Sequence, residues 1–112
     1  MKLFHRIEKE TCVISVVGNI ALNDTSELET YIRPFISHTK IKQIILNCKN
    51  VEIIDSRGVG LLAAILKDLE DEKKSFLLCH LNSATYGILE SLQLHKIIRV
   101  KSTEEEALAE FN

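Results

Sequence analysis

The sequence predicts an α/β fold, a single domain over residues 1–112 with the element order β-β-α-β-α-β-α-β-α. Short apolar runs rich in Val and Ile alternate with longer segments whose apolar residues have helical spacing. The chain length of 112 residues suits one hydrophobic core. Alternation of this kind requires parallel neighbours joined by right-handed crossovers, so we expect a mixed β-sheet of about five strands with four helices.

The first two strands are expected to form a hairpin. Residues 3–8 alternate between apolar and polar side chains, which is typical of an edge or half-exposed strand. Lys9 and Glu10 form a plausible turn. Residues 12–17 are an almost continuous run of Val and Ile, which predicts a strand covered on both faces.

A helix is predicted over residues 24–39, with Asn23, Asp24 or Thr25 as its cap. Its apolar positions follow helical spacing: Leu28, Ile32, Phe35, Ile36 and Thr39. Pro34 lies inside this segment and lacks a backbone donor, so we expect a kink or a break there.

The middle of the chain predicts two more buried strands, at residues 44–48 and 76–79, separated by a helix over 56–70. One face of that helix carries its apolar residues: Val59, Leu62, Ala63, Leu66 and Leu69.

The last third predicts a helix, a strand over residues 97–100 and a final short helix. The first of these helices runs through Ile88, Leu89 and Leu92. Thr103 and Glu106 have the spacing of a capping box. The final helix is expected to bury Ala107, Leu108 and Phe111.

Composition argues against several classes of protein. A net charge of −2 and scattered basic residues give no reason to expect nucleic-acid binding. No apolar run reaches the length of a membrane span, so we expect no direct membrane insertion. Charged residues follow the first residue too closely for a signal peptide, so we expect a cytoplasmic location. Cys12, Cys48 and Cys79 sit in apolar stretches without a paired motif, which favours buried reduced thiols over a metal or redox site.

The segment over residues 50–62 has residues that the packing of a hydrophobic core alone does not explain. A buried strand ends, a loop follows, and Asp55 or Ser56 is the natural N-cap of the next helix. In α/β sheets, sites gather where strands end and helix N-termini present free amides. Gly58 and Gly60 are unfavourable in a helix but allow another backbone to approach closely. Two readings stay open here: a helix packed tightly on its own sheet, or a functional surface.

The run from Asp55 to Leu62 resembles the Asp-Ser-small-Gly-x-Gly-x-Leu signature of STAS domains, most closely that of bacterial anti-sigma factor antagonists. The element order matches that family over nearly the whole chain. The resemblance implies that Ser56 is phosphorylated by an anti-sigma factor that is also an ATP-binding serine kinase. It further implies that a serine phosphatase removes the phosphate, and that the unmodified protein binds the anti-sigma factor and releases a sigma factor.

The resemblance and the chain topology together imply a partner surface at one end of the sheet. Its expected members are Asn19, Ala21, Asp24, Asp55, Ser56, Arg57, Gly58, Val59 and Gly60. Two departures from the family stand out. Arg57 replaces a small residue, and the sequence from Gly18 to Ala21 replaces Gly-Glu-hydrophobic-Asp, so acidic residues that help relatives engage the kinase are absent, although Asp24 follows.

Other functions find less support in the sequence. A dinucleotide loop lacks its third glycine, a P-loop lacks Gly-Lys-Ser/Thr, and nothing brings a histidine to Ser56 for hydrolase chemistry, so no enzyme activity and no cofactor are expected. The alternative within the family is an unphosphorylated STAS scaffold or the soluble STAS subunit of a lipid transporter. Those relatives often carry threonine at the acceptor position, and the serine here favours the phosphorylated antagonist.

Overall fold

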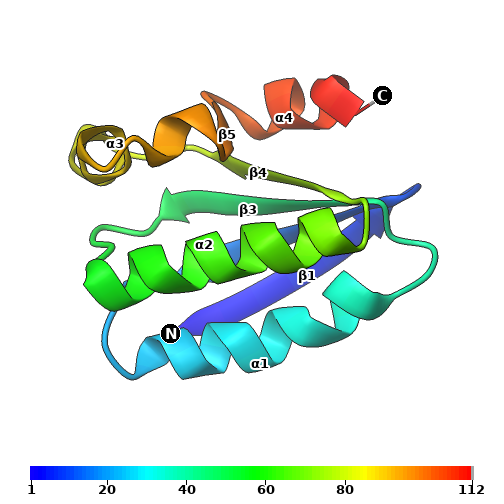
Figure 1. Ribbon diagram of the computed structural model, residues 1–112, viewed down its shortest axis with the longest axis horizontal. Coiled ribbons are helices and arrows are strands. Elements are labelled where there is room, and N and C mark those ends of the chain that lie inside the picture. Colours follow the sequence, from blue (N-terminus) through cyan, green and yellow to red (C-terminus); the bar gives the residue numbers. More distant parts are fainter. Residues whose placement is uncertain (112) are drawn as a thin grey trace.

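The strands form one mixed sheet in the order β1-β2-β3-β4-β5 in a computed structural model, which describes residues 1–111 (Figure 1). The strands are β1 (Lys2–Glu8), β2 (Thr11–Val17), β3 (Gln43–Asn50), β4 (Ser75–Cys79) and β5 (Arg99–Lys101). β1 runs antiparallel to β2, and all other neighbours are parallel. The mixed sheet with an opening hairpin is therefore confirmed. Residue 112, to which the expected domain extends, lies outside the described residues.

The helices cover both faces of this sheet. They are α1 (Asp24–Ser37), α2 (Ser56–Asp71), α3 (Ser83–Ser91) and α4 (Glu104–Phe111), with a single turn of 3₁₀ helix, η1 (Leu94–Lys96), before β5. α1 and α2 lie side by side on one face, while α4 packs on β3, β4 and β5 from the other (Figure 1). Among residues 1–111, no helix combines the length and the apolar character needed to cross a bilayer.

The central strands are apolar at consecutive positions because helices cover both sides of them. On β3, Ile44 and Leu46 belong to the core shared with α1 and α2. Ile45 points to the opposite face, where it packs in a smaller cluster with Leu77 of β4 and Ala107 of α4. β2, β3 and β4 are parallel neighbours, so their carboxyl ends reach the same edge of the sheet.

The break considered at Pro34 is absent, since α1 continues through it to Ser37. Pro34 lies in the last turn of the helix, and its missing amide leaves only the carbonyl of exposed Thr30 without a helical partner. Water can solvate that carbonyl. Thr39, expected on the buried face, lies beyond the helix and is exposed.

The buried face of α2 differs from the predicted one. Val59 and Ala63 are half-buried rather than fully buried. The buried apolar residues are Leu61, Leu62, Ile65, Leu66 and Leu69. The stripe is wider because α2 contacts both α1 and the sheet at β4, so two sides of the helix are covered.

The C-terminal third contains two further corrections. The last strand is Arg99–Lys101 and not residues 97–100, because the chain first makes η1 and leaves Ile97 exposed at its end. Phe111, expected to be buried, is 37% exposed at the end of α4, and Ala107 is the helix residue that is fully buried.

The capping box of α4 is present. The Thr103 hydroxyl oxygen accepts a hydrogen bond from the Glu106 amide at 3.1 Å. The Glu106 carboxylate in turn accepts from the Ser102 amide at 3.3 Å, one residue earlier than the usual reciprocal bond.

Candidate functional site

Two loops that are far apart in sequence meet at the carboxyl ends of β2 and β3. Ile20, after β2, forms an isolated parallel bridge with Ile54, after β3. The Ile20 amide donates to the Ile53 carbonyl at 3.0 Å, and the Asp55 amide donates back to the Ile20 carbonyl at 3.3 Å. Both isoleucines of the bridge are buried. The start of α2 is thereby fixed to the loop that leads into α1.

Asp55 is the N-cap of α2 and joins the two loops through its side chain. One carboxylate oxygen accepts from the Gly58 amide at 2.9 Å, and the other accepts from the Leu22 amide at 3.0 Å. The Gly58 amide is the main cause that lowers the pKa of Asp55 from its ordinary value, and the amides of Leu22 and Arg57 add to it. Asp55 is therefore ionised at neutral pH and serves as a structural acceptor.

Two asparagines hold the β3–α2 loop from either side. The Ile53 amide donates to the Asn19 side-chain oxygen at 3.1 Å. The Asn82 side-chain amide donates to the carbonyls of Val51 and Glu52, each at 3.3 Å, while its oxygen caps α3. The loop before Ser56 is thus bonded on both sides, and the N-terminus of α2 has a fixed position.

Ser56 is the first residue of α2 and is exposed. Arg57 beside it is also exposed, as expected, and its guanidinium donates a long hydrogen bond of 3.5 Å to the side chain of Asn23. Ser56 is exposed at a helix N-terminus, where the helix dipole favours an anion. The position suits a phosphate without requiring the helix to move.

Gly58 and Gly60 differ in their surroundings although both lie in the first two turns of α2. Gly58 is buried, and a Cβ atom there would lie 2.0 Å from the Ile20 carbonyl oxygen. Gly60 is exposed, and a Cβ there would meet nothing within 4 Å. The close-packing reading accounts for Gly58, since its missing side chain lets α2 touch the β2–α1 loop. Gly60 keeps an exposed turn of α2 free of side chain.

The structure brings the remaining expected residues to the same end of the sheet with different exposure. Asn19 is exposed, while Ala21, Asp24 and Val59 are half-buried. Val59 packs against the main core from α2.

Leu22 lies within the loop from Asn19 to Asp24, but the sequence predicts neither Leu22 nor Ile53 as a site residue. Leu22 is 65% exposed and Ile53 is 52% exposed, on the two loops that Asp55 joins. Leu22 also has a positive φ of 51°, an uncommon conformation for a leucine. Ile53 has a sequence signal, because it is a bulky apolar residue two positions before the signature motif, whereas Leu22 is far from the motif in the sequence.

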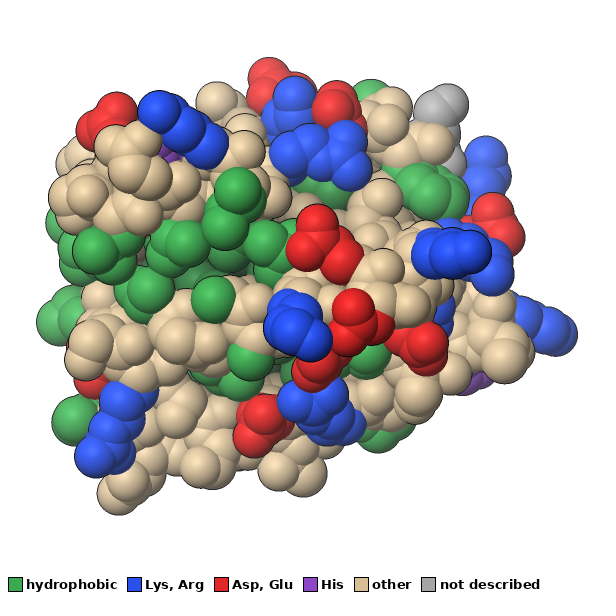
Figure 2. All heavy atoms as spheres, in the orientation of Figure 1, with side chains coloured by type: hydrophobic (Ala, Val, Ile, Leu, Met, Phe, Trp, Pro, Cys, Tyr) green, Lys and Arg blue, Asp and Glu red, His purple; other side chains and the backbone are tan. Residues whose placement is uncertain are grey.

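Hydrophobic side chains also gather on the surface around the N-terminal half of α2 and between it and the segment of α3 and η1 (Figure 2). Leu92 and Ile97, which end α3 and η1, are more than half exposed. Exposed apolar surface of this kind marks a site of protein contact more often than a small polar ligand site.

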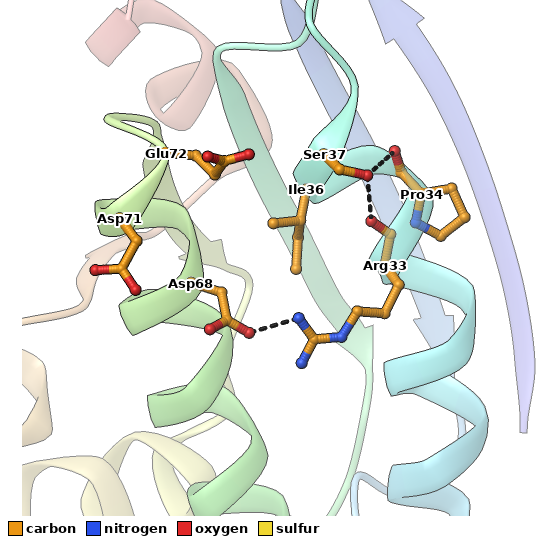
Figure 3. A pocket seen from close by; sticks show the side chains of 7 residues that line it. All are labelled: Arg33, Pro34, Ile36, Ser37, Asp68, Asp71 and Glu72. Carbon is orange, nitrogen blue, oxygen red and sulfur yellow. Dashed lines mark hydrogen bonds and ion pairs between the residues drawn. The ribbon is translucent and has the colours of Figure 1, made fainter.

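A hollow of about 430 Å³ lies at the opposite end of α2, between its last turns and those of α1. Figure 3 shows Arg33 reaching across it to Asp68, with an ion-pair distance of 2.6 Å. Arg33 is paired again with Glu29 at 3.1 Å. Because the Arg33 guanidinium is already bound to two carboxylates of the chain, we interpret this hollow as a junction between two helices and not as a binding site.

Comparison with known proteins finds a family model and a relative that each match most of the chain. The family described as STAS domain matches residues 5–107 of the chain. The anti-sigma F factor antagonist of Paenibacillus polymyxa is 21% identical over 98 residues, which are 88% of this chain and 84% of that protein.

Solved structures of similar fold come from proteins with different described roles. The anti-sigma factor antagonist SpoIIAA in its unphosphorylated form is 22% identical, with a TM-score of 0.82 over 98% of this chain and 96% of that one. SpoIIAA from Bacillus in its phosphorylated form has a TM-score of 0.76 at 22% identity, over 99% and 100% of the chains. A sulfate transporter family protein from Wolinella succinogenes has a TM-score of 0.80 at 20% identity, over 93% and 86%.

Proposed function

The chain belongs to the STAS domain family, and we propose that it is an anti-sigma factor antagonist switched by phosphorylation of Ser56. In the unphosphorylated state it binds an anti-sigma factor that is an ATP-dependent serine kinase, and a sigma factor is released. The kinase turns the antagonist off by phosphorylating Ser56, and a serine phosphatase restores it.

The geometry of Ser56 is the single observation that carries this proposal. Its hydroxyl is exposed at the first position of α2, directly after an N-cap that two backbone amides hold in place. A kinase can reach this hydroxyl without unfolding the helix. The curated relative described as an anti-sigma F factor antagonist and the phosphorylated form of SpoIIAA support the same function.

A partner surface around Ser56 follows from its neighbours. The exposed apolar side chains of Leu22 and Ile53 supply area for contact with a protein, and Arg57 supplies a positive charge beside them. The exposed turn at Gly60 allows a partner backbone to approach α2 closely. This combination fits a folded protein partner.

Phosphorylation acts on the partner more than on the fold. A phosphate adds about −1.5 to −2 charge at neutral pH, and the N-terminus of α2 accommodates an anion. The added bulk and charge lie in a surface that must lose its water when the partner binds. An anion desolvated without a counter-charge costs more than the 1.4 kcal/mol or so that corresponds to tenfold in affinity.

Incubation with ATP and the purified kinase partner, followed by phosphopeptide mapping, tests the proposal. Ser83 is a matched control within the chain, because it is the exposed first residue of α3 and follows an N-cap, Asn82, that also accepts from a backbone amide. We expect phosphate on Ser56 and none on Ser83. Phosphate on another residue with Ser56 unmodified would overturn the assignment.

The second candidate is an unphosphorylated STAS scaffold or transporter subunit. The similarity in fold to the Wolinella sulfate transporter family protein is the observation that favours it. The same incubation distinguishes the two, because this candidate takes up no phosphate on Ser56 from any ATP-dependent anti-sigma factor of the organism.

A further inference from the structure

The strand β1 is a free edge of the sheet. It pairs with β2 over all seven of its residues, and it stands at the end of the strand order, so no other strand among residues 1–111 pairs with its outer side (Figure 1). Two of its apolar side chains, Phe4 and Ile7, are 57% and 50% exposed. An exposed edge of this length is a template for pairing with another strand unless its side chains prevent it.

The hairpin turn decides which backbone groups of β1 point outward. Only Lys9 and Glu10 separate the paired residues Glu8 and Thr11, and the residues that flank a two-residue hairpin loop form a hydrogen-bonded pair. Hydrogen-bonded pairs alternate along an antiparallel ladder. The residues at even positions therefore bond to β2, and the amides and carbonyls of the odd positions face the free edge: Leu3, His5 and Ile7.

We propose that β1 pairs in antiparallel fashion with β1 of a second copy of this chain, about a two-fold axis at His5. This register uses the whole strand and joins the odd positions by about six main-chain hydrogen bonds. It places Lys2 opposite Glu8 of the second copy. The two five-stranded sheets become one continuous sheet across the dimer.

The side chains of β1 are complementary to themselves in this register. Lys2 meets the opposite charge of Glu8, and Leu3 meets the apolar Ile7. Phe4 meets Arg6, a pair that can form a cation–π contact. Opposite-charge and apolar cross-strand pairs stabilise a sheet, and like charges directly opposite destabilise it.

The charges also exclude the neighbouring registers. The backbone pattern permits shifts of the centre by one residue, because the odd positions still face the partner. A centre at Phe4 places Lys2 opposite Arg6. A centre at Arg6 places the two arginines opposite each other. Both registers therefore bring like charges together, and the one centred at His5 does not.

The edge is also held in shape before a second copy arrives. The Arg6 guanidinium is bound to Glu8 at 2.8 Å and to Glu104 of α4 at 2.6 Å. On the other face of the strand, His5 Nδ1 and the Tyr31 hydroxyl share a hydrogen bond of 2.6 Å. The His5 ring also packs on the Phe35 ring, with the two ring centroids 4.7 Å apart. A strand fixed on both faces loses little further freedom when it pairs.

Sedimentation velocity over a concentration series up to the millimolar range tests this proposal. We expect a reversible monomer–dimer equilibrium for the unaltered chain. Lys2→Glu and Glu8→Lys each create two like-charged pairs in the dimer and weaken association by about tenfold. The double variant restores opposite charges and restores the dimer. Lys67→Glu, a matched charge change on α2, leaves association unchanged.

Amide hydrogen exchange gives a second readout that a general loss of folding would not imitate. At high protein concentration the outward amides of Leu3, His5 and Ile7 become protected, while those of Phe4 and Arg6 are protected at every concentration. A chain that stays monomeric throughout the series overturns the proposal. So does a dimer whose affinity is the same in both single-charge variants, or whose double variant stays dissociated.

Discussion

Replacing Gly58 by alanine tests how α2 is seated on the loop that leads into α1. The added Cβ atom would lie 2.0 Å from the Ile20 carbonyl oxygen and 2.9 Å from a methyl group of Ile54. The carbonyl is backbone, and it already accepts the Asp55 amide at 3.3 Å. The loop or the helix must therefore move, because no side-chain rotation relieves the overlap.

The size of the effect follows from two opposing terms. The Cβ and the carbonyl oxygen must separate by roughly 1.4 Å more to reach ordinary contact, which is a displacement typical of overpacked cores that lose about 1–3 kcal/mol. Alanine gains about 1 kcal/mol over glycine in a helix interior. Because the overlap is with backbone and also strains the bridge between Ile20 and Ile54, the upper end of that range applies. A loss of about 3 kcal/mol less a gain of about 1 kcal/mol leaves Gly58→Ala with a free energy of unfolding lower by about 2 kcal/mol.

Gly60→Ala is the matched control in the same helix. Its Cβ would meet nothing within 4 Å, so only the helix-propensity term remains. We expect this variant to be more stable than the unaltered chain by about 1 kcal/mol. In thermal unfolding followed by circular dichroism, Gly58→Ala should lower Tm by roughly 8 °C and Gly60→Ala should raise it by roughly 4 °C. A Gly58→Ala variant as stable as the unaltered chain would refute the close approach between α2 and Ile20.

Three further predictions concern the same structure. The pKa of Asp55 is lowered chiefly by the Gly58 amide, so its stabilising effect is complete above about pH 4 and is lost as the pH falls through the folded-state pKa. Asp55→Ala should be less stable at neutral pH and should lose less Tm between about pH 5 and pH 2 than the unaltered chain. Burial raises the pKa of Cys12 to about 11 and those of Cys48 and Cys79 to about 12, so the native protein should react slowly with a thiol reagent at about pH 8, and all three thiols should react once it is unfolded. Arg57→Glu should weaken binding of the kinase partner by about tenfold at low salt and by less at high salt, because an exposed charge acts mainly on the association rate. An effect on affinity that does not depend on salt would contradict an electrostatic role of Arg57.

The sequence was sufficient to predict the sheet because its central strands are covered on both faces. β2, β3 and β4 read as continuous apolar runs, and the helices between them fix the parallel order. The same kind of apolar run predicts that the last strand begins two residues earlier than it does. Ile97 and Ile98 look like part of a buried strand, but only Ile98 is buried, and Ile97 ends η1 in solvent.

The sequence predicts where the candidate site lies in the chain, but it does not predict the hydrogen bonds that hold the site in place. Asp55 and Ser56 at a strand-to-helix junction are visible in the sequence, and the cap at Asp55 is confirmed. The bonds from Asn19 and Asn82 to the β3–α2 loop join residues about thirty positions apart, which no local pattern reveals. The two glycines were equivalent in the sequence, and only the structure separates buried Gly58 from open Gly60.

Titration calorimetry of the kinase partner against three forms of the chain tests the central proposal most directly. The forms are the unmodified chain, the chain phosphorylated at Ser56, and Ser56→Ala. We expect the unmodified chain and Ser56→Ala to bind with the same affinity and the phosphorylated chain to bind at least about tenfold more weakly. Its circular dichroism should match that of the unmodified chain, because the N-terminus of α2 accommodates the phosphate. Equal affinity of the phosphorylated and unmodified chains would contradict the switch, and so would a loss of binding that accompanies unfolding.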